Sequence, residues 1–103
     1  MRLLIRFKML WDVVLVAVKN DGSALLFANK ELRADREVAL EAVKNDGNAL
    51  EYVARELKSD REIVVEAVKS SKGEALKYAS KRMQGDKSIL KEAGKVTHKT
   101  SEL

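Results

Sequence analysis

Few side chains in this sequence have the type and the spacing that catalysis requires. The single histidine, His98, lies in a polar stretch with no hydrophobic pattern to hold it, so we expect it to be solvated. Two pairs of glutamates stand four residues apart, close enough on a helix to bind a cation or to share a proton. These pairs are Glu37 with Glu41 and Glu62 with Glu66. A lysine follows each pair, so a salt-bridged, solvent-exposed helix face is the simpler interpretation.

Other kinds of chemical site lack their residues. The sequence has no cysteine, which excludes a disulfide framework, a thiolate nucleophile and a zinc site built on sulfur. It contains neither a glycine-rich phosphate loop nor histidines at metal-ligand spacing. The Lys-Asn-Asp-Gly turns that begin at Lys19 and Lys44 lack the alternating oxygen ligands and the closing glutamate of a calcium loop. We therefore expect no catalytic residue, no cofactor and no metal ion, in a protein that is not an enzyme.

The composition is that of one small domain. The chain has 103 residues, of which 46% are hydrophobic, and a chain of this length has room for a single core. It has 20 basic and 16 acidic residues, which gives a formal net charge of +4. Basic and acidic residues balance over residues 1–76, so the whole excess lies in residues 77–103. This basic region is a candidate for contact with an anionic partner.

The N-terminal region has too few consecutive apolar residues to cross a membrane or to act as a secretory signal. Its longest unbroken apolar run spans residues 13–18, whereas a bilayer span needs about 20 apolar residues. Arg6, Lys8 and Asp12 interrupt the sequence before this run, and no small-residue cleavage site follows it. We expect no membrane partner, and a location in the cytoplasm or export without a cleavable signal.

An internal repeat of about 25 residues organises the chain. Residues 35–44 recur as residues 60–69, and an aspartate, an arginine and a glutamate open both segments. Residues 48–57 recur as residues 74–83, one position later because Lys72 is inserted before them. The period therefore covers a complete unit of structure and not a single helix.

Each unit is predicted to contain two helices of about 10 residues. At helical spacing, the apolar residues of the first helix cover an arc wide enough to contact neighbours on two sides. Asn48 with Glu51 is predicted to cap the second helix of the middle unit. An aspartate precedes each first helix as its N-cap, at Asp35, Asp60 and Asp86. A glycine follows the first helix, where a positive φ would end it, at Gly22, Gly47 and Gly73.

Two short helices joined by a tight turn pack as an antiparallel hairpin, and successive hairpins of one template stack on one another. The predicted fold is therefore all-α, with tandem helix-hairpin repeats of about 25 residues stacked as a short α-solenoid. A compact bundle of six or seven helices is the alternative, with the same elements but no uniform offset between hairpins. The predicted domain covers residues 1–95, with units at about 10–34, 35–59 and 60–85, a partial unit at 86–95 and a polar tail at 96–103.

The N-terminal end departs from the template toward apolar residues. Val16 stands where the later units have glutamate, and Trp11 stands where they have arginine. Residues 1–7 match the end of a second helix, as if a preceding unit ended there. We expect this end to present an apolar face around Trp11 and Val16.

The repeated pattern resembles a known family. It runs aspartate, a basic residue, glutamate, three apolar residues, glutamate, alanine, valine and lysine, followed by glycine and by Ala-Leu-x-Tyr. It is similar to the DUF4116 family, a helical repeat family of unknown function, over about residues 12–93, and residues 35–57 fit best. The resemblance implies a tandem array of repeats, and it supplies no activity, ligand or catalytic residue.

The function that these observations favour is binding. Stacked hairpins expose long surfaces whose side chains can vary without disturbing the core. We expect a protein-interaction or self-association module that binds a protein partner, or a second copy of the chain, through Trp11 and Val16 of the apolar N-terminal face. Nucleic-acid binding through the basic C-terminal ridge is the alternative. The ridge carries Lys30, Arg55, Lys77, Lys81 and Arg82, and it continues with Lys87, Lys91, Lys95 and Lys99.

Two further features bear on these hypotheses. Only Tyr78 offers a nearby ring on which a nucleic-acid base could stack, which weakens the nucleic-acid alternative. Ser101, Glu102 and Leu103 match the short C-terminal motif that PDZ-type grooves bind, although three residues match often by chance.

Overall fold

The structure is a computed structural model that describes the backbone of residues 2–93 and the side chains of residues 10–93. Throughout this range the chain forms helices and connecting turns, with no strand. The predictions that concern Lys95, His98, Ser101–Leu103 and the polar tail at 96–103 fall outside the described residues.

Three long α-helices alternate with shorter helices along the chain, among which η denotes a 3₁₀-helix. The long helices are α1 (Arg2–Asn20), α3 (Arg36–Asn45) and α4 (Arg61–Ser70). The shorter helices are η1 (Gly22–Phe27), α2 (Lys30–Arg33), η2 (Gly47–Tyr52), η3 (Arg55–Ser59), η4 (Glu74–Tyr78) and α5 (Lys81–Gln84). The last described helix, residues 87–93, follows α5.

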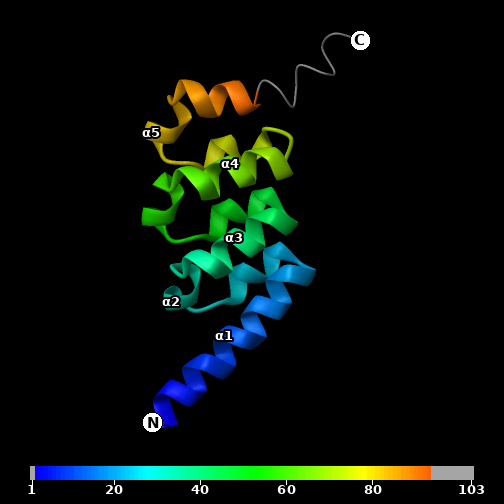
Figure 1. The fold of residues 1–103 in the computed structure, drawn as a ribbon, viewed down its shortest axis with the longest axis vertical. Coiled ribbons are helices and arrows are strands. Elements are labelled where there is room, and N and C mark those ends of the chain that lie inside the picture. The colour runs from blue at the N-terminus through cyan, green and yellow to red at the C-terminus, as the bar shows by residue number, and fades with distance from the viewer. Residues whose placement is uncertain (1, 94–103) are drawn as a thin grey trace.

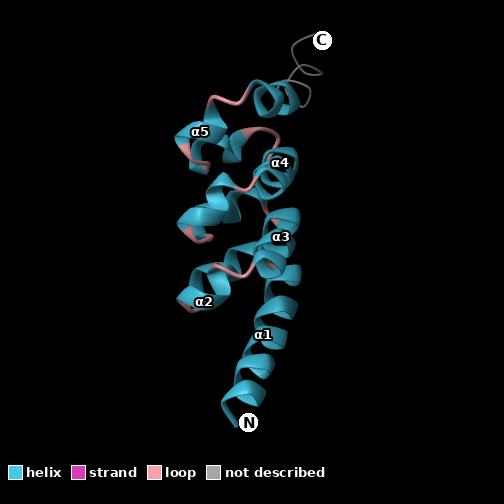
Figure 2. Ribbon diagram, turned by 60° about the vertical axis from the view of Figure 1, so that its left-hand side comes forward, coloured by secondary structure: helices cyan, strands magenta, loops and turns pink. Residues whose placement is uncertain are grey.

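The units follow one another along the longest axis of the molecule, as Figure 1 shows. Figure 2 shows the long helices along one side and the short helices along the other. Helix α3 packs between α1 and α4, and η2 packs between η1 and η4. Each of these elements therefore contacts its counterparts in the units before and after it. The all-α class and the tandem helical repeats are confirmed.

Aspartates cap the first helix of each later unit, as predicted. The carboxylate of Asp35 accepts hydrogen bonds from the backbone N–H groups of Glu37 and Val38, at 3.0 and 3.1 Å. Asp60 accepts from the N–H of Ile63 in the same way, and Asp86 caps residues 87–93. These bonds satisfy donors that have no partner within the helix itself.

The glycines after the first helices serve a different purpose from the one predicted. A positive φ occurs at Gly73, where φ is 92°, but not at Gly22 or Gly47. A Cβ atom on Gly47 would lie 2.1 Å from the carbonyl oxygen of Ala67, and a Cβ on Gly22 would lie 2.3 Å from that of Ala42. The prediction of positive φ at these two positions is wrong, because glycine is required there for close contact with the following unit.

The second helix of each unit is not continuous, contrary to prediction. In the middle unit η2 ends at Tyr52, Val53 is extended with φ −73° and ψ 156°, and η3 begins at Arg55. The N–H of Ala54 donates to the carbonyl of Arg33 in the preceding unit at 3.0 Å. The corresponding bond in the next unit joins Ser80 to Lys58, at 3.1 Å. The backbone leaves its helix here because this position bonds to the neighbouring unit.

The cap of this second segment also differs from the prediction. Asp46, not Asn48, caps η2, and its side chain accepts from the N–H of Asn48. The Oδ1 atom of Asn48 is buried and has no hydrogen-bonding partner. Asp46 reaches this role because it both ends α3 and begins η2, so one residue serves the whole turn.

Helix α1 is continuous through the position where a unit boundary was expected. The first residues were predicted to end a preceding second helix, but Arg2–Asn20 form one α-helix. Leu10 stands at the position of the capping aspartates, and its apolar side chain cannot cap a new helix. No glycine or proline interrupts the segment either, so the helix continues.

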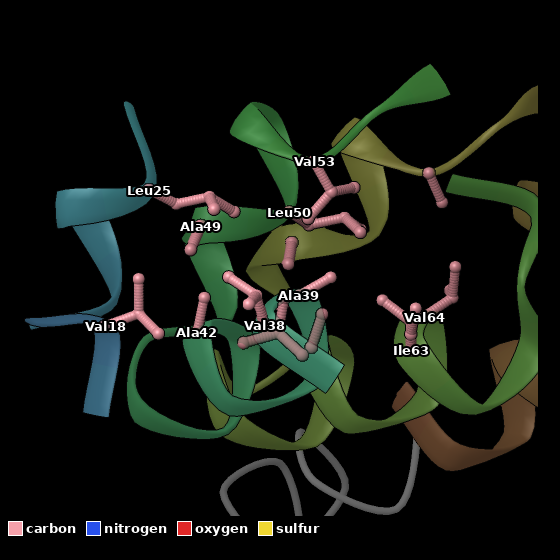
Figure 3. Packing of buried hydrophobic residues seen from close by; sticks show 14 of the residues in the cluster. Val18, Leu25, Val38, Ala39, Ala42, Ala49, Leu50, Val53, Ile63 and Val64 are labelled. Atoms are coloured by element: carbon pink, nitrogen blue, oxygen red, sulfur yellow. The ribbon is translucent and has the colours of Figure 1, made fainter. Parts of the chain in front are cut away.

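The core consists of apolar side chains shared between neighbouring units. Helix α3 contributes four buried residues because it is covered on two sides, which agrees with its wide apolar arc. Figure 3 shows Val38 and Ala42 of α3 on one side of this core and Ala49 and Leu50 of η2 on the other. Among the described side chains, no polar or charged residue is fully buried.

Candidate interaction surfaces

An apolar end face lies at the N-terminal end of the stack. We define it by the large apolar side chains that are more than half exposed there: Leu10, Val13 and Val16 of α1 and Phe27 of η1. Three of these side chains repeat at every third residue of α1 and so lie on one side of the helix. Val16 was predicted to belong to such a face, and the structure leaves it exposed as expected.

Comparison of equivalent positions explains why this face is open. Val13 is 64% exposed, whereas its counterparts Val38 and Ile63 are 0% exposed. Val38 belongs to a helix that packs against the preceding unit, and Val13 has no such unit beneath it among the described residues. Phe27 follows the same rule, since it is exposed while its counterpart Tyr52 is half-buried. At Val13 and Phe27, the end face therefore corresponds to positions that are less exposed in the later units.

Trp11 does not belong to this face, contrary to prediction. Its side chain is half-buried and packs against the core. Its indole N–H donates to the carboxylate of Asp35 at 3.0 Å, so the ring is directed toward the following unit. Trp11 occupies the position of Arg36, whose side chain also contacts the following unit.

A ladder of polar contacts joins successive units at this position. Arg36 donates to Asp60 at 2.8 Å and also pairs with Glu62, both in the following unit. Arg61 donates to the hydroxyl of Ser88 at 2.8 Å, one unit further on. In each joint, the residue after one unit's N-cap contacts the next unit's N-cap or the residue two places beyond it. The predicted glutamate–lysine face is thus replaced, at Glu62, by an ion pair between units.

These contacts lower the pKa of two of the capping carboxyls, those of Asp60 and Asp86. The Arg36 guanidinium donates to Asp60 and holds the pKa of its carboxyl below the ordinary value, and the Ile63 and Glu62 backbone N–H groups add to the effect. A hydrogen bond from the Ser88 hydroxyl similarly lowers the pKa of Asp86. Hydrogen bonds that also cap the helices and join the units account for both shifts.

The basic ridge predicted from the sequence is only partly gathered by the structure. Lys81 lines an open pocket together with Arg55 and Lys58 of the preceding unit, and no carboxylate lines it. Lys77 lies elsewhere, 3.9 Å from Glu74 and 5.2 Å from the ring centre of Tyr78. Arg82 and Lys91 are exposed but do not line this pocket. The local basic cluster is therefore Arg55, Lys58 and Lys81.

An equivalent pocket of about 430 Å³ lies one unit earlier. Lys30, Arg33 and Arg55 line it together with Glu31 and Glu56, so its charges nearly balance. Sequence reasoning did not select Arg33 or Lys58. The signal for both was the repeat itself, because the two residues occupy equivalent positions and both are basic.

The described part of the chain contains neither a candidate metal site nor a candidate membrane-spanning helix. No group of three or more histidine, cysteine, aspartate or glutamate side chains in it could hold a metal ion. Among residues 2–93, no helix combines the length and the apolar character that crossing a bilayer demands.

Comparison with known proteins identifies the repeat. The model of a family described as a domain of unknown function, DUF4116, matches three overlapping stretches, residues 11–58, 35–84 and 60–99. The chain belongs to the DUF4116 family. Each match spans about two of the units seen in the structure, and successive matches begin in step with them. Searches of curated proteins and of solved structures gave no significant match.

Proposed function

We propose that this DUF4116 chain is a non-enzymatic module, stacked as a short solenoid, that binds another protein through its apolar end face. The observation that supports this is the exposure of Val13, at 64%, where the same position is closed at Val38 and Ile63. Repeat arrays commonly end in a unit with a polar outer face that keeps the array soluble. A unit with an apolar outer face is instead stabilised when a partner covers that face.

The free energy gained by covering the apolar end face is large enough to support association. Covering apolar surface contributes roughly 25 cal/mol per Å², so four large side chains supply several kcal/mol before the cost of association is subtracted. The end face also consists of helix and 3₁₀-helix backbone held by the core, so little ordering is needed on binding.

A photocrosslinking amino acid placed at Val13 of the full chain tests the proposal. We expect it to form covalent adducts with protein, either a partner or another copy, and Val16→Asp in the same chain to reduce them strongly. The matched control carries the crosslinker at Glu51, which is exposed on η2 of the middle unit. An absence of protein adducts at Val13, or equal adducts at both positions, would contradict the proposal.

A second candidate is nucleic-acid binding at the basic pocket. It is favoured by the convergence of Arg55, Lys58 and Lys81 with no carboxylate in the lining. Anisotropy titrations with single- and double-stranded oligonucleotides at two salt concentrations test it. If the pocket binds phosphates, Lys81→Glu weakens binding and lowers its salt dependence, whereas Lys44→Glu on α3 leaves both unchanged. Weak binding without a salt slope would exclude this function.

A further inference from the structure

We propose that the end face docks head to tail on the last described helix, residues 87–93, of a second copy of this chain. The inference rests on the proposed function and names the partner. Its basis is the recurrence of the joints between units: at each joint, the residue after the N-cap position contacts the next unit's N-cap or the residue two places beyond it. The first unit and the last described helix each present one half of such a joint.

The polar ladder specifies which residues would meet. Arg36 of one unit contacts Asp60 and Glu62 of the next, and Arg61 contacts Ser88 in the position of Glu62. One unit further on, the position of Arg36 is occupied by Lys87. In the first unit, the position of Glu62 is occupied by Asp12. A second copy in the same register therefore brings Lys87 to Asp12, a cation to an anion, as at the Arg36 joint.

Neither of these two side chains has a partner among the described residues. The side chains of Lys87 and Asp12 are exposed, and neither side chain forms a hydrogen bond or an ion pair with a described residue. Their counterparts Arg36 and Glu62 are paired with each other. The first unit and the last described helix thus carry opposite charges at equivalent positions of the ladder.

The apolar residues at the two ends agree with the same joint. Val13 is 64% exposed on the first unit, and Leu90 is 44% exposed on the last described helix. The counterparts of Leu90 are Ala39 and Val64, which are 0% exposed inside the stack. Each end therefore exposes a side chain that the internal units bury, which is what an interface divided between two copies requires.

The proposed contact joins different surfaces on the two copies. Such a heterologous interface does not close on itself unless a rotation forms a ring, so copies add to either end. We expect association that increases with concentration without stopping at a dimer.

Sedimentation velocity of the full chain with two charge reversals tests the inference. Asp12→Lys and Lys87→Glu each place like charges at the joint, and each is expected to weaken association by roughly fivefold. An equimolar mixture of the two variants restores association, because both kinds of contact between the variants then join opposite charges. Glu51→Lys and Lys44→Glu, which reverse charges at exposed positions away from both ends, are the matched controls.

Several outcomes would overturn the inference. They are a wild-type chain that stays monomeric at all concentrations, variants that associate as the wild type does, and a mixture that shows no recovery. If the chain is monomeric while the crosslinker at Val13 captures a different protein, the second copy is excluded and the proposed function stands. If it is monomeric and no protein is captured, both proposals fail.

Discussion

Gly22 and Gly47 allow the carbonyl groups of the following unit's helix to approach the backbone closely. A Cβ atom at Gly47 would meet the Ala67 oxygen at 2.1 Å, which is far inside van der Waals contact. Backbone lies on both sides of this contact, so no flexible side chain can move away to make room. The residue type is therefore fixed by the joint between units and not by the turn.

Gly47→Ala is expected to lower the free energy of unfolding by about 2 kcal/mol, because the joint must open to admit the methyl group. Gly85→Ala is the matched control, since a Cβ there meets its nearest atom at an ordinary 3.7 Å. That control should be neutral or stabilise slightly, by restricting the unfolded chain. Chemical denaturation of both variants measures the difference, and equal effects would argue against a close joint.

Asp60 gives the fold a dependence on pH. Its folded pKa is lowered, chiefly by the hydrogen bond from Arg36, so the carboxylate stabilises the folded state above the unfolded pKa of about 3.9. This contribution is complete at neutral pH and is lost as the pH falls through the folded value. Acid should therefore weaken the joint between the second and third units.

Asp60→Asn keeps a side chain that can cap α4 but removes the charge. We expect it to lower the free energy of unfolding by about 1 kcal/mol at pH 7 and to have progressively less effect below pH about 4, as the wild-type carboxyl also becomes neutral. Glu51→Gln, at an exposed position that forms no ion pair with a described residue, should show no such trend. Thermal melts from pH 7 to acid measure it, and a difference that persists in acid would show that charge is not the cause.

At the scale of helices, equivalent positions in different units experience different surroundings. Val13 and Val38 share a residue type and a place in the template, yet one is exposed and the other fully buried. Position in the repeat therefore does not determine burial at the ends of the stack.

Val38→Ala should lower the free energy of unfolding by about 2 kcal/mol, since it removes buried methyl groups and leaves a cavity. Val13→Ala should change it by less than about 0.5 kcal/mol at concentrations where the chain is monomeric. The pair is its own control, because both changes are Val to Ala in an α-helix. Equal losses in denaturant titrations would mean that Val13 is covered in the folded monomer.

The sequence predicts the helices of this fold better than it predicts their breaks. The aspartate caps and the first helices follow from local rules that the residues of each helix satisfy alone. The break at Val53 and Ala54 contains no glycine or proline and lies within a helical apolar pattern. It depends on the bond from Ala54 to Arg33 in another unit, a contact that no local pattern records.

The same distinction applies to the candidate surfaces. Val16 could be assigned to the apolar face from the sequence, because the later units have glutamate at the equivalent position. Trp11 could not be placed correctly from its apolar character, because its indole N–H makes a polar contact with Asp35. Lys58 and Lys81 come from successive units and line the same pocket. Their proximity could not be predicted from the sequence, because it depends on how the units are offset in space.

At the scale of the whole molecule, stability is distributed along a line of units. In repeat proteins each unit contacts only its neighbours, so the free energy is approximately a sum of unit and joint terms. The middle unit has a joint on each side, through α1 and through α4. The first unit lacks one of these joints among the described residues.

Native-state hydrogen exchange should reveal this arrangement. We expect the slowest-exchanging amides in α3 and in the part of α4 that packs on it, and faster exchange in α1 before Leu10 and in residues 87–93. Exchange monitored by NMR at low protein concentration tests this for the single chain. Uniform protection along the chain would indicate one cooperative core instead of coupled units.

Trp11 is the one tryptophan of the chain, and its bond to Asp35 spans the joint between the first two units. Its fluorescence therefore reports on that joint alone, while circular dichroism averages over all helices. If the units separate in steps, the two signals change at different denaturant concentrations; if they unfold together, the two curves coincide. Trp11 is therefore an intrinsic fluorescent probe of how cooperatively the units of this short array unfold.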